Sequence, residues 1–168
     1  MADQIAAYFS GIPNHWITFC LAMLPITELR GSIPWAILLG DLNWKEAFLW
    51  SILGNFVPVI PVLLLLEPCA KFLRRWKLFD RFFEWLFTRT RRKGKVVERY
   101  KALGLMIFVG IPLPGTGAWT GALAAFIFGI PFPLALISIL LGVILAGVLV
   151  TGVVVGGSTA FQAIFGIG

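Results

Sequence analysis

Four long apolar stretches follow one another along the chain, and proline and glycine interrupt two of them. The stretches cover residues 16–40, 47–66, 102–129 and 132–155. The first is broken at Pro25–Gly31 and the third at Ile111–Gly117, so each predicts two short helices joined by a turn. The other two each offer about 20 apolar residues or more, enough to cross a hydrocarbon core of roughly 30 Å. Pro58 and Pro61 are expected to kink the second stretch.

The two halves of the chain present the same order of features: an interrupted apolar stretch, an exit ending in glycine, a short turn and a full span. A shift of 89 positions places Leu24-Pro25 on Leu113-Pro114, Thr27 on Thr116 and Gly40 on Gly129. With one residue of slippage, Gly54 falls on Gly142. Because each half has one full span, the second half would enter the membrane from the opposite face, which makes an inverted repeat.

We therefore expect an all-α integral membrane protein, built as an inverted repeat of a re-entrant helical hairpin plus a transmembrane helix, with an interfacial amphipathic helix between the halves. The first half is 1–66, with an interfacial N-terminus, a hairpin at 16–40 and a transmembrane helix at 44–66. The linker is 67–101. The second half is 102–168, with a hairpin at 102–129 and a transmembrane helix at 132–156. The rival topology has four full spans with both termini inside, and charge alone does not separate the two.

Composition supports the membrane assignment. Hydrophobic residues make up 59% of the 168 positions and charged residues only 13%. In a soluble domain roughly a quarter of the residues are charged, so this chain has too few charged residues to cover a surface exposed to water.

Positive charge is concentrated between Lys71 and Lys101, where twelve Lys and Arg stand against three acidic residues. By the positive-inside rule this linker is cytoplasmic, in a multi-pass protein of the plasma or inner membrane. Large aromatic residues recur on one helical face of the linker, and basic residues on the other: Arg74, Arg75, Lys77 and Arg81 are the predicted contacts to lipid headgroups. An orientation signal without substrate contact is the alternative, and nucleic-acid binding is disfavoured because membrane segments flank the linker.

Two ionisable side chains, Glu28 and Arg30, stand alone in the first apolar stretch. Charge at bilayer depth is costly and usually marks a pathway or a buried site. Burial favours the neutral form of a carboxyl and hydration the charged form, so Glu28 is a candidate proton carrier. The guanidinium of Arg30 suits a carboxylate or phosphate oxygen. The alternative is that the two side chains neutralise each other and hold the hairpin tip together.

The second hairpin offers hydroxyls, an indole and the free N–H groups of a restarting helix, which together suit an anionic group. The predicted substrate and proton pathway comprises Thr27, Glu28, Arg30, Gly31, Thr116, Trp119 and Thr120. The predicted hairpin breaks are Pro25, Pro34, Pro112, Pro114, Gly115 and Gly117. Two GxxxG pairs, Gly117 with Gly121 and Gly152 with Gly156, predict close helix packing.

Enzymatic chemistry has no support in the sequence. The chain has one His and two Cys, and it lacks an HExxH motif, a serine-centred elbow and a carboxylate cluster. We expect no catalytic residue, no metal site and no cofactor.

The segments PITELRGSIP at 25–34 and PLPGTGAWTGALAA at 112–125, together with the basic linker, resemble the family of putative small multidrug export proteins over nearly the whole chain. The architecture is also similar to that of the DedA/VTT superfamily, whose two opposed re-entrant hairpins are associated with lipid movement across bilayers. That resemblance implies that Glu28 corresponds to the acidic residue of the first hairpin. The arginine of that superfamily near the second hairpin has no counterpart here.

These features predict a small transporter or lipid translocase, proton-linked and homo-oligomeric, that moves an anionic amphiphile such as a phosphate-headed lipid. Arg30 and the amides of Gly115–Gly121 are the reason for an anionic group. A homodimer or higher oligomer is expected because two hairpins and two spans cannot easily enclose a cavity alone. The alternatives are a small-molecule drug exporter and a non-transporting membrane scaffold that recruits lipids or a protein partner. Nucleic acid is not an expected partner.

Overall fold

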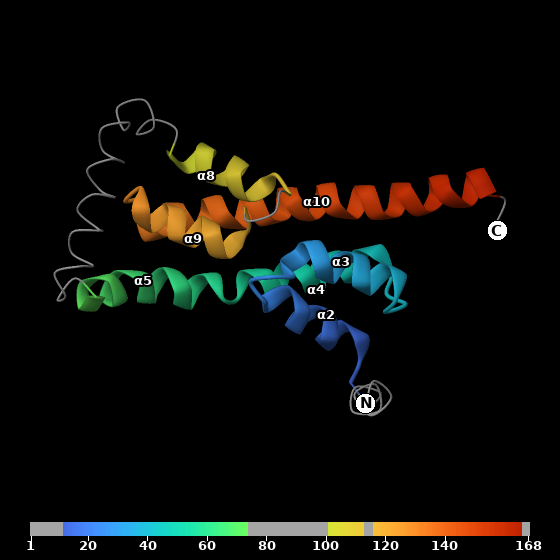
Figure 1. The fold of residues 1–168 in the computed structure, drawn as a ribbon, viewed down its shortest axis with the longest axis horizontal. Coiled ribbons are helices and arrows are strands. Elements are labelled where there is room, and N and C mark those ends of the chain that lie inside the picture. The colour runs from blue at the N-terminus through green and yellow to red at the C-terminus, as the bar shows by residue number, and fades with distance from the viewer. Residues whose placement is uncertain (1–11, 74–100, 113–115, 166–168) are drawn as a thin grey trace. The chain divides into compact units, whose positions relative to one another are not determined.

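The computed structural model describes residues 12–73, 101–112 and 116–165, and within these ranges the chain is helical and contains no strand. The expected all-α class is therefore confirmed. The described helices are α2 (Asn14–Met23), α3 (Glu28–Leu38), α4 (Trp44–Phe56), α5 (Val59–Leu73), α8 (Lys101–Gly110), α9 (Ala118–Ile127) and α10 (Phe132–Phe165) (Figure 1).

Both interrupted apolar stretches are pairs of short helices. α2 and α3 are separated by residues 24–27, and α8 and α9 by residues 111–117. The stretch that was expected to be kinked by proline is divided as well, because α4 ends at Phe56 and α5 begins at Val59. Pro58 cannot donate a helical hydrogen bond, while its carbonyl accepts one from the Val62 N–H at 3.1 Å. Pro34 lies inside α3 without ending it.

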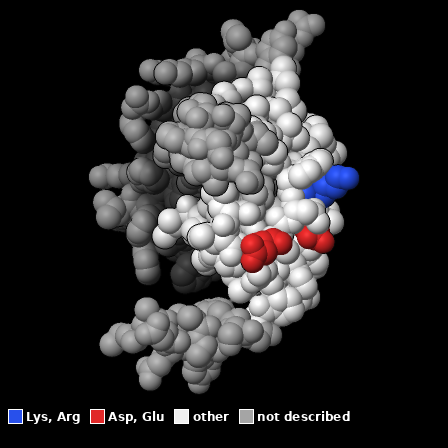
Figure 2. Space-filling model, turned by 90° about the vertical axis from the view of Figure 1, so that its right-hand side faces the viewer, with Lys and Arg blue, Asp and Glu red and all other residues white. Residues whose placement is uncertain are grey.

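Two segments are long and apolar enough to cross a membrane by length and composition, Trp44–Leu66 and Phe132–Gly157. Large apolar side chains are widely exposed along them, including Leu49, Leu64 and Val153. Figure 2 shows one face on which most described atoms belong to uncharged residues. An apolar surface of this kind suits contact with lipid, because lipid tails solvate apolar side chains as well as a protein interior does.

The chain divides into two compact units, each described here by itself. The first unit comprises Met1–Asn55 with Gly147–Gly168, and the second comprises Phe56–Ala146. The predicted halves, 1–66 and 102–168, stay a prediction. In the first unit the last part of α10 packs on α4: a Cβ added at Gly147 would lie 2.9 Å from Phe48 Cε2 and 3.0 Å from Ile52 Cδ1. The predicted linker also begins inside a helix, since α5 continues to Leu73.

In the first unit, α2 lies against both α3 and α4. The side-chain amide of Asn14 donates to the Gly40 carbonyl at 2.8 Å, which ties the start of α2 to the residues after α3. The rings of His15 and Trp50 stack with centroids 4.9 Å apart, and Trp16 lies 5.4 Å from Trp50. Aromatic contacts of this kind add to the burial of apolar area between α2 and α4.

Gly54 lets α4 approach α2 closely. A Cβ at this position would lie 2.2 Å from the Phe19 carbonyl oxygen and 3.0 Å from Ala22 Cβ. No side chain fits at such a distance from a backbone oxygen, so only glycine allows this approach.

The second unit repeats this contact with its own helices. A Cβ at Gly142, in α10, would lie 2.7 Å from the Met106 carbonyl oxygen and 2.7 Å from Val109 Cβ, both in α8. In each unit, therefore, a glycine of the spanning segment meets the first short helix at a carbonyl and at the side chain three residues further on. Gly121 also packs closely, against Val109. A Cβ added at Gly152 or Gly156 would meet nothing within 4 Å among the described residues, so the close helix packing expected at these two positions is not seen.

We predict that Gly54→Ala and Gly142→Ala each lower the unfolding free energy by about 1–3 kcal/mol, because the added methyl group overpacks a fixed backbone contact. Thermal unfolding of the purified protein in detergent measures the change. Gly104→Ala is the matched control, since a Cβ there meets nothing within 4 Å. Gly104→Ala should be neutral or stabilising by up to ~1 kcal/mol, as helix propensity alone dictates. Equal melting temperatures for all three variants would contradict the close approach.

Candidate functional site

Glu28 stands at the break between α2 and α3 and is buried, with only 5% of its surface exposed. Its backbone φ is 47°, in the left-handed region that non-glycine residues rarely adopt. Holding a glutamate there costs on the order of 1–2 kcal/mol, and such strain is concentrated at functional sites. The combination of burial, an ionisable side chain and backbone strain makes Glu28 the leading candidate in the first unit.

Hydrogen bonds within the break hold its shape. The Glu28 N–H donates to the Leu24 carbonyl at 2.9 Å, and the Gly31 N–H donates to the Thr27 carbonyl at 2.8 Å. The Thr27 hydroxyl donates to the Leu21 carbonyl, near the end of α2. Thr27 thus compensates a carbonyl that the interrupted helix would leave without its usual partner.

Arg30 is partly buried in the first turns of α3, and its Nε is among the buried atoms. Gly31 packs against Thr27, where a Cβ would lie 3.0 Å from Thr27 Cβ. The structure thus places the first-hairpin members of the predicted pathway in one short segment, 27–31. Whether the carboxylate of Glu28 and the guanidinium of Arg30 neutralise each other stays a prediction.

Three further polar side chains of α3 and α4 are buried, and they are not among the predicted site residues. Ser32 in α3 donates from Oγ to Ser51 Oγ in α4 at 2.7 Å, and both serines are 0% exposed. Asn55, one turn beyond Ser51, is also 0% exposed. The signal was present in the sequence, because Ser51 and Asn55 are polar residues four apart in an otherwise apolar span.

In the second hairpin the predicted hydroxyls bond to their own backbone. The Thr116 hydroxyl donates to the Ile111 carbonyl at 2.8 Å, and the Thr120 hydroxyl donates to the Gly117 carbonyl at 3.0 Å. The Thr116 bond crosses the interruption between α8 and α9, as the Thr27 bond crosses the first one, whereas the Thr120 bond lies within the first turn of α9. Trp119 is partly buried in the first turn of α9.

The two sets of predicted residues belong to different units, so their meeting at one site stays a prediction. Of the predicted breaks, Pro112 is exposed and Gly117 precedes α9. Pro114 and Gly115 lie outside the described residues, as do the predicted headgroup contacts Arg74, Arg75, Lys77 and Arg81. Across the described ranges, no three His, Cys, Asp or Glu side chains lie together as metal ligands would.

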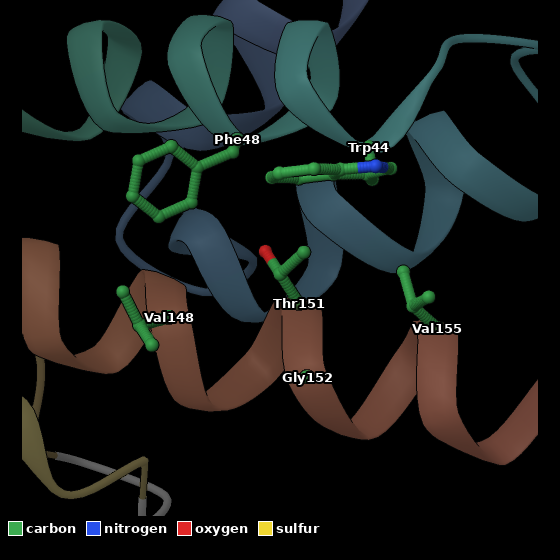
Figure 3. Close-up of a pocket in the computed structure, with 6 residues that line it drawn as sticks. All are labelled: Trp44, Phe48, Val148, Thr151, Gly152 and Val155. Atoms are coloured by element: carbon green, nitrogen blue, oxygen red, sulfur yellow. The ribbon is translucent and has the colours of Figure 1, made fainter.

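A cavity of about 350 Å³ lies within the first unit, between α4 and the last part of α10. It is lined by Trp44, Phe48, Val148, Thr151, Gly152 and Val155 (Figure 3). Figure 3 shows the Thr151 hydroxyl directed toward the space between the Phe48 and Trp44 rings. Among the described residues this buried hydroxyl has no hydrogen-bond partner. We call this open cavity the α4–α10 groove; its lining is mainly apolar.

The Trp44 end of the α4–α10 groove carries charges of both signs. Lys45 Nζ lies 5.5 Å from the centroid of the Trp44 ring. Glu46 follows in the same helical turn, and the Asn43 side-chain oxygen caps that turn by accepting from the Lys45 and Glu46 N–H groups at 3.0 Å each. The helix start is thereby fixed, and with it the position of Trp44.

Two apolar spanning segments and a buried carboxyl at a helix break define the chain as a membrane protein. Within that class, the model of the family described as "Putative small multi-drug export protein" matches residues 28–149, well over half of the chain. The protein belongs to this family. No curated protein and no solved structure matches the chain.

We predict that a double-mutant cycle on Ser32→Ala and Ser51→Ala yields a coupling of about 0.5–1.5 kcal/mol, the net value of one buried hydrogen bond. Unfolding in detergent supplies the four stabilities. A matched cycle that pairs Ser32→Ala with Ser138→Ala, a buried serine of the second unit, should be additive. A coupling near zero for Ser32 and Ser51 would show that the hydroxyls do not interact.

Proposed function

We propose that the protein exports small amphiphilic molecules and binds them in the α4–α10 groove. The observation that carries the proposal is the groove itself: an apolar cavity of about 350 Å³ with one unpartnered hydroxyl among the described residues. Membership of a family described as small multi-drug export proteins supports it. We assign the protein no enzymatic step.

The groove suits molecules that are apolar along most of their length. Trp44 and Phe48 offer aromatic faces, and Val148 and Val155 offer aliphatic walls. Thr151 offers one hydroxyl that can donate to or accept from a polar group of the ligand. Broad selectivity follows, because apolar contact discriminates weakly between ligands whereas multiple hydrogen bonds would discriminate strongly.

Glu28 is the residue that we assign to energy coupling. A buried carboxyl at a strained helix break can bind and release a cation as its surroundings change, and intramembrane carboxyls in transporters commonly do so. The simplest such cation is the proton, which is the coupling ion that the sequence predicts.

The inverted repeat of two re-entrant hairpins stays part of the proposal. Its support is the pair of matching glycine contacts, Gly54 on α2 and Gly142 on α8. Its second support is the pair of hydroxyl-closed interruptions before α3 and α9. The proposed location is the plasma or inner membrane, with the basic linker cytoplasmic and the protein assembled as a homo-oligomer. A distant relationship to the DedA/VTT superfamily would fit this architecture.

Translocation of a phosphate-headed lipid takes second place to drug export. The residues that line the α4–α10 groove include no cation, and the nearest charges at its Trp44 end, Lys45 and Glu46, are of opposite sign. A scaffold that acts through the basic linker is the third possibility, and its residues lie outside the described ranges.

We predict that Glu28→Gln abolishes dye export from proteoliposomes loaded with ethidium or with calcein, because the amide cannot take part in charge coupling. Trp44→Ala should raise the half-saturating dye concentration by roughly tenfold, equivalent to ~1.4 kcal/mol of binding. Thr151→Val, which keeps the side-chain shape, should raise it by about threefold. Leu49→Ala is the control, since this α4 side chain is similarly exposed, 54% against 50% for Trp44, and lies outside the groove.

Other outcomes identify the rival functions. Movement of a fluorescent phosphatidylglycerol, with neither dye exported, would identify a lipid translocase. If Glu28→Gln assembles normally and changes no transport while substitutions at Arg74 or Arg81 abolish the cellular phenotype, the scaffold is correct and export is not.

We predict that single cysteines placed at Asn43 and at both termini are labelled from outside, and cysteines at Gly94 and Pro131 from inside. The background lacks Cys20 and Cys69, and a membrane-impermeant thiol reagent reports the side. This pattern is required by two opposed hairpins. Termini labelled from inside, with Asn43 and Pro131 outside, would establish four plain spans and exclude the inverted repeat.

A further inference from the structure

Thr151 of α10 has a buried hydroxyl that bonds to none of the described residues. Its side chain is 8% exposed, and its Oγ1 has no hydrogen-bond partner in the part of the chain that the structure describes. A threonine within a helix commonly donates its hydroxyl to a carbonyl of the preceding turn, which here would be that of Gly147. The Thr151 hydroxyl is instead directed into the α4–α10 groove, toward the space between the rings of Phe48 and Trp44 (Figure 3).

This orientation is an exception among the threonines whose side chains the structure describes. The others all donate to a backbone carbonyl: Thr18, Thr27, Thr116 and Thr120. A hydroxyl that is buried without an acceptor carries a desolvation cost that a hydrogen bond would offset. We therefore expect Thr151 to donate to an acceptor that the described residues do not supply.

The lining of the α4–α10 groove limits what this acceptor can be. Among the lining residues, the indole N–H of Trp44 is the other polar side-chain group, and it can donate but not accept. None of the six lining residues is ionisable. The groove thus presents hydrogen-bond donors on an aromatic and aliphatic wall, without a charge that could balance an ion.

An ionised ligand group would be poorly accommodated in this groove. Taking an ion out of water is costly unless a counter-charge or several hydrogen bonds compensate it. Because Lys45 Nζ already lies 5.5 Å from the centroid of the Trp44 ring, a cation stacked on that ring would meet a like charge. An anion at the same end would meet Glu46, which follows in the same helical turn. An uncharged acceptor such as a carbonyl oxygen avoids both costs.

We infer that the α4–α10 groove binds uncharged, planar aromatic groups that carry a carbonyl oxygen, and that Thr151 donates a hydrogen bond to this oxygen. The rings of Trp44 and Phe48 supply the aromatic contact. A charged group of the same ligand stays outside the groove, in water or among lipid headgroups. The inference deepens the proposed function by naming a substrate class, and it rests on that function only for the export of the bound compound.

The test is a binding measurement on the purified full-length protein in detergent, with four tricyclic probes of similar size. N-methylacridone is uncharged and has a carbonyl, anthracene is uncharged and has no acceptor, N-methylacridinium is a cation, and anthracene-9-carboxylate is an anion. Fluorescence anisotropy reports binding, and micelles without protein give the background. N-methylacridone should bind saturably and at least roughly tenfold more tightly than either ion, because only the ions lose hydration without compensation.

Substitutions at Thr151 separate the hydrogen bond from packing. Thr151→Val should raise the Kd for N-methylacridone by about three- to tenfold and leave that for anthracene unchanged, since anthracene has no oxygen. Retained anthracene binding also shows that the variant is folded. Thr151→Ser keeps a hydroxyl and should keep the preference for N-methylacridone. Thr18→Val is the matched control, because this buried threonine of α2 already donates to the Asn14 carbonyl, and it should change neither Kd.

The opposite results overturn the inference and the proposed function separately. In Thr151→Val, equal changes in affinity for N-methylacridone and anthracene, or no change for either, would exclude the hydrogen bond. Tighter binding of either ion than of N-methylacridone would exclude the uncharged class. If no probe binds saturably while dye export persists, export stands and the groove is not its site. If the probes bind with the expected preferences and no dye is exported, the inference stands and the exporter proposal falls.

Discussion

An interrupted helix in an apolar environment must satisfy its own backbone, and this constraint shapes the interruptions before α3 and α9. No water is available at membrane depth to bond the carbonyls that a break exposes, so protein groups must do it. Thr27 donates to Leu21, and Thr116 donates to Ile111, each across the interruption. Thr27 and Thr116, which the sequence predicts to be pathway residues, thus stabilise the backbone of the two interruptions. Glu28 stands at the first of these interruptions and is buried.

The two units have similar helix contacts but different side chains beside these contacts. Glycine brings each spanning helix onto the first helix of a hairpin, Gly54 in one unit and Gly142 in the other. Beside these contacts, Ser32 of α3 bonds to Ser51 of α4 in the first unit, whereas Gly121 of α9 lies near Ile139 of α10 in the second. The same order of helices thus accommodates a polar contact in one unit and an apolar contact in the other.

Helices and their interruptions could be predicted because proline, glycine and apolar length act locally. Glu28 could be identified as a candidate because an ionisable residue in an apolar stretch is recognisable from the sequence alone. The contact between Ser32 and Ser51 could not be predicted, because it depends on the register of α3 against α4, which only the three-dimensional structure reveals. The α4–α10 groove was equally hidden, since Trp44 and Thr151 are more than a hundred positions apart in the chain.

The tip of the first hairpin has a consequence for handling the protein. Turns in soluble proteins carry polar residues, yet Ile26 is 94% exposed and Leu24, two positions earlier, is 50% exposed. In water an uncovered isoleucine forgoes roughly 1.5–3 kcal/mol of burial free energy. Whatever apolar medium covers this tip is thus part of the folded state. Detergents that form small micelles and cover it poorly should inactivate the protein before its helices unfold, and lipid-like detergents should preserve it.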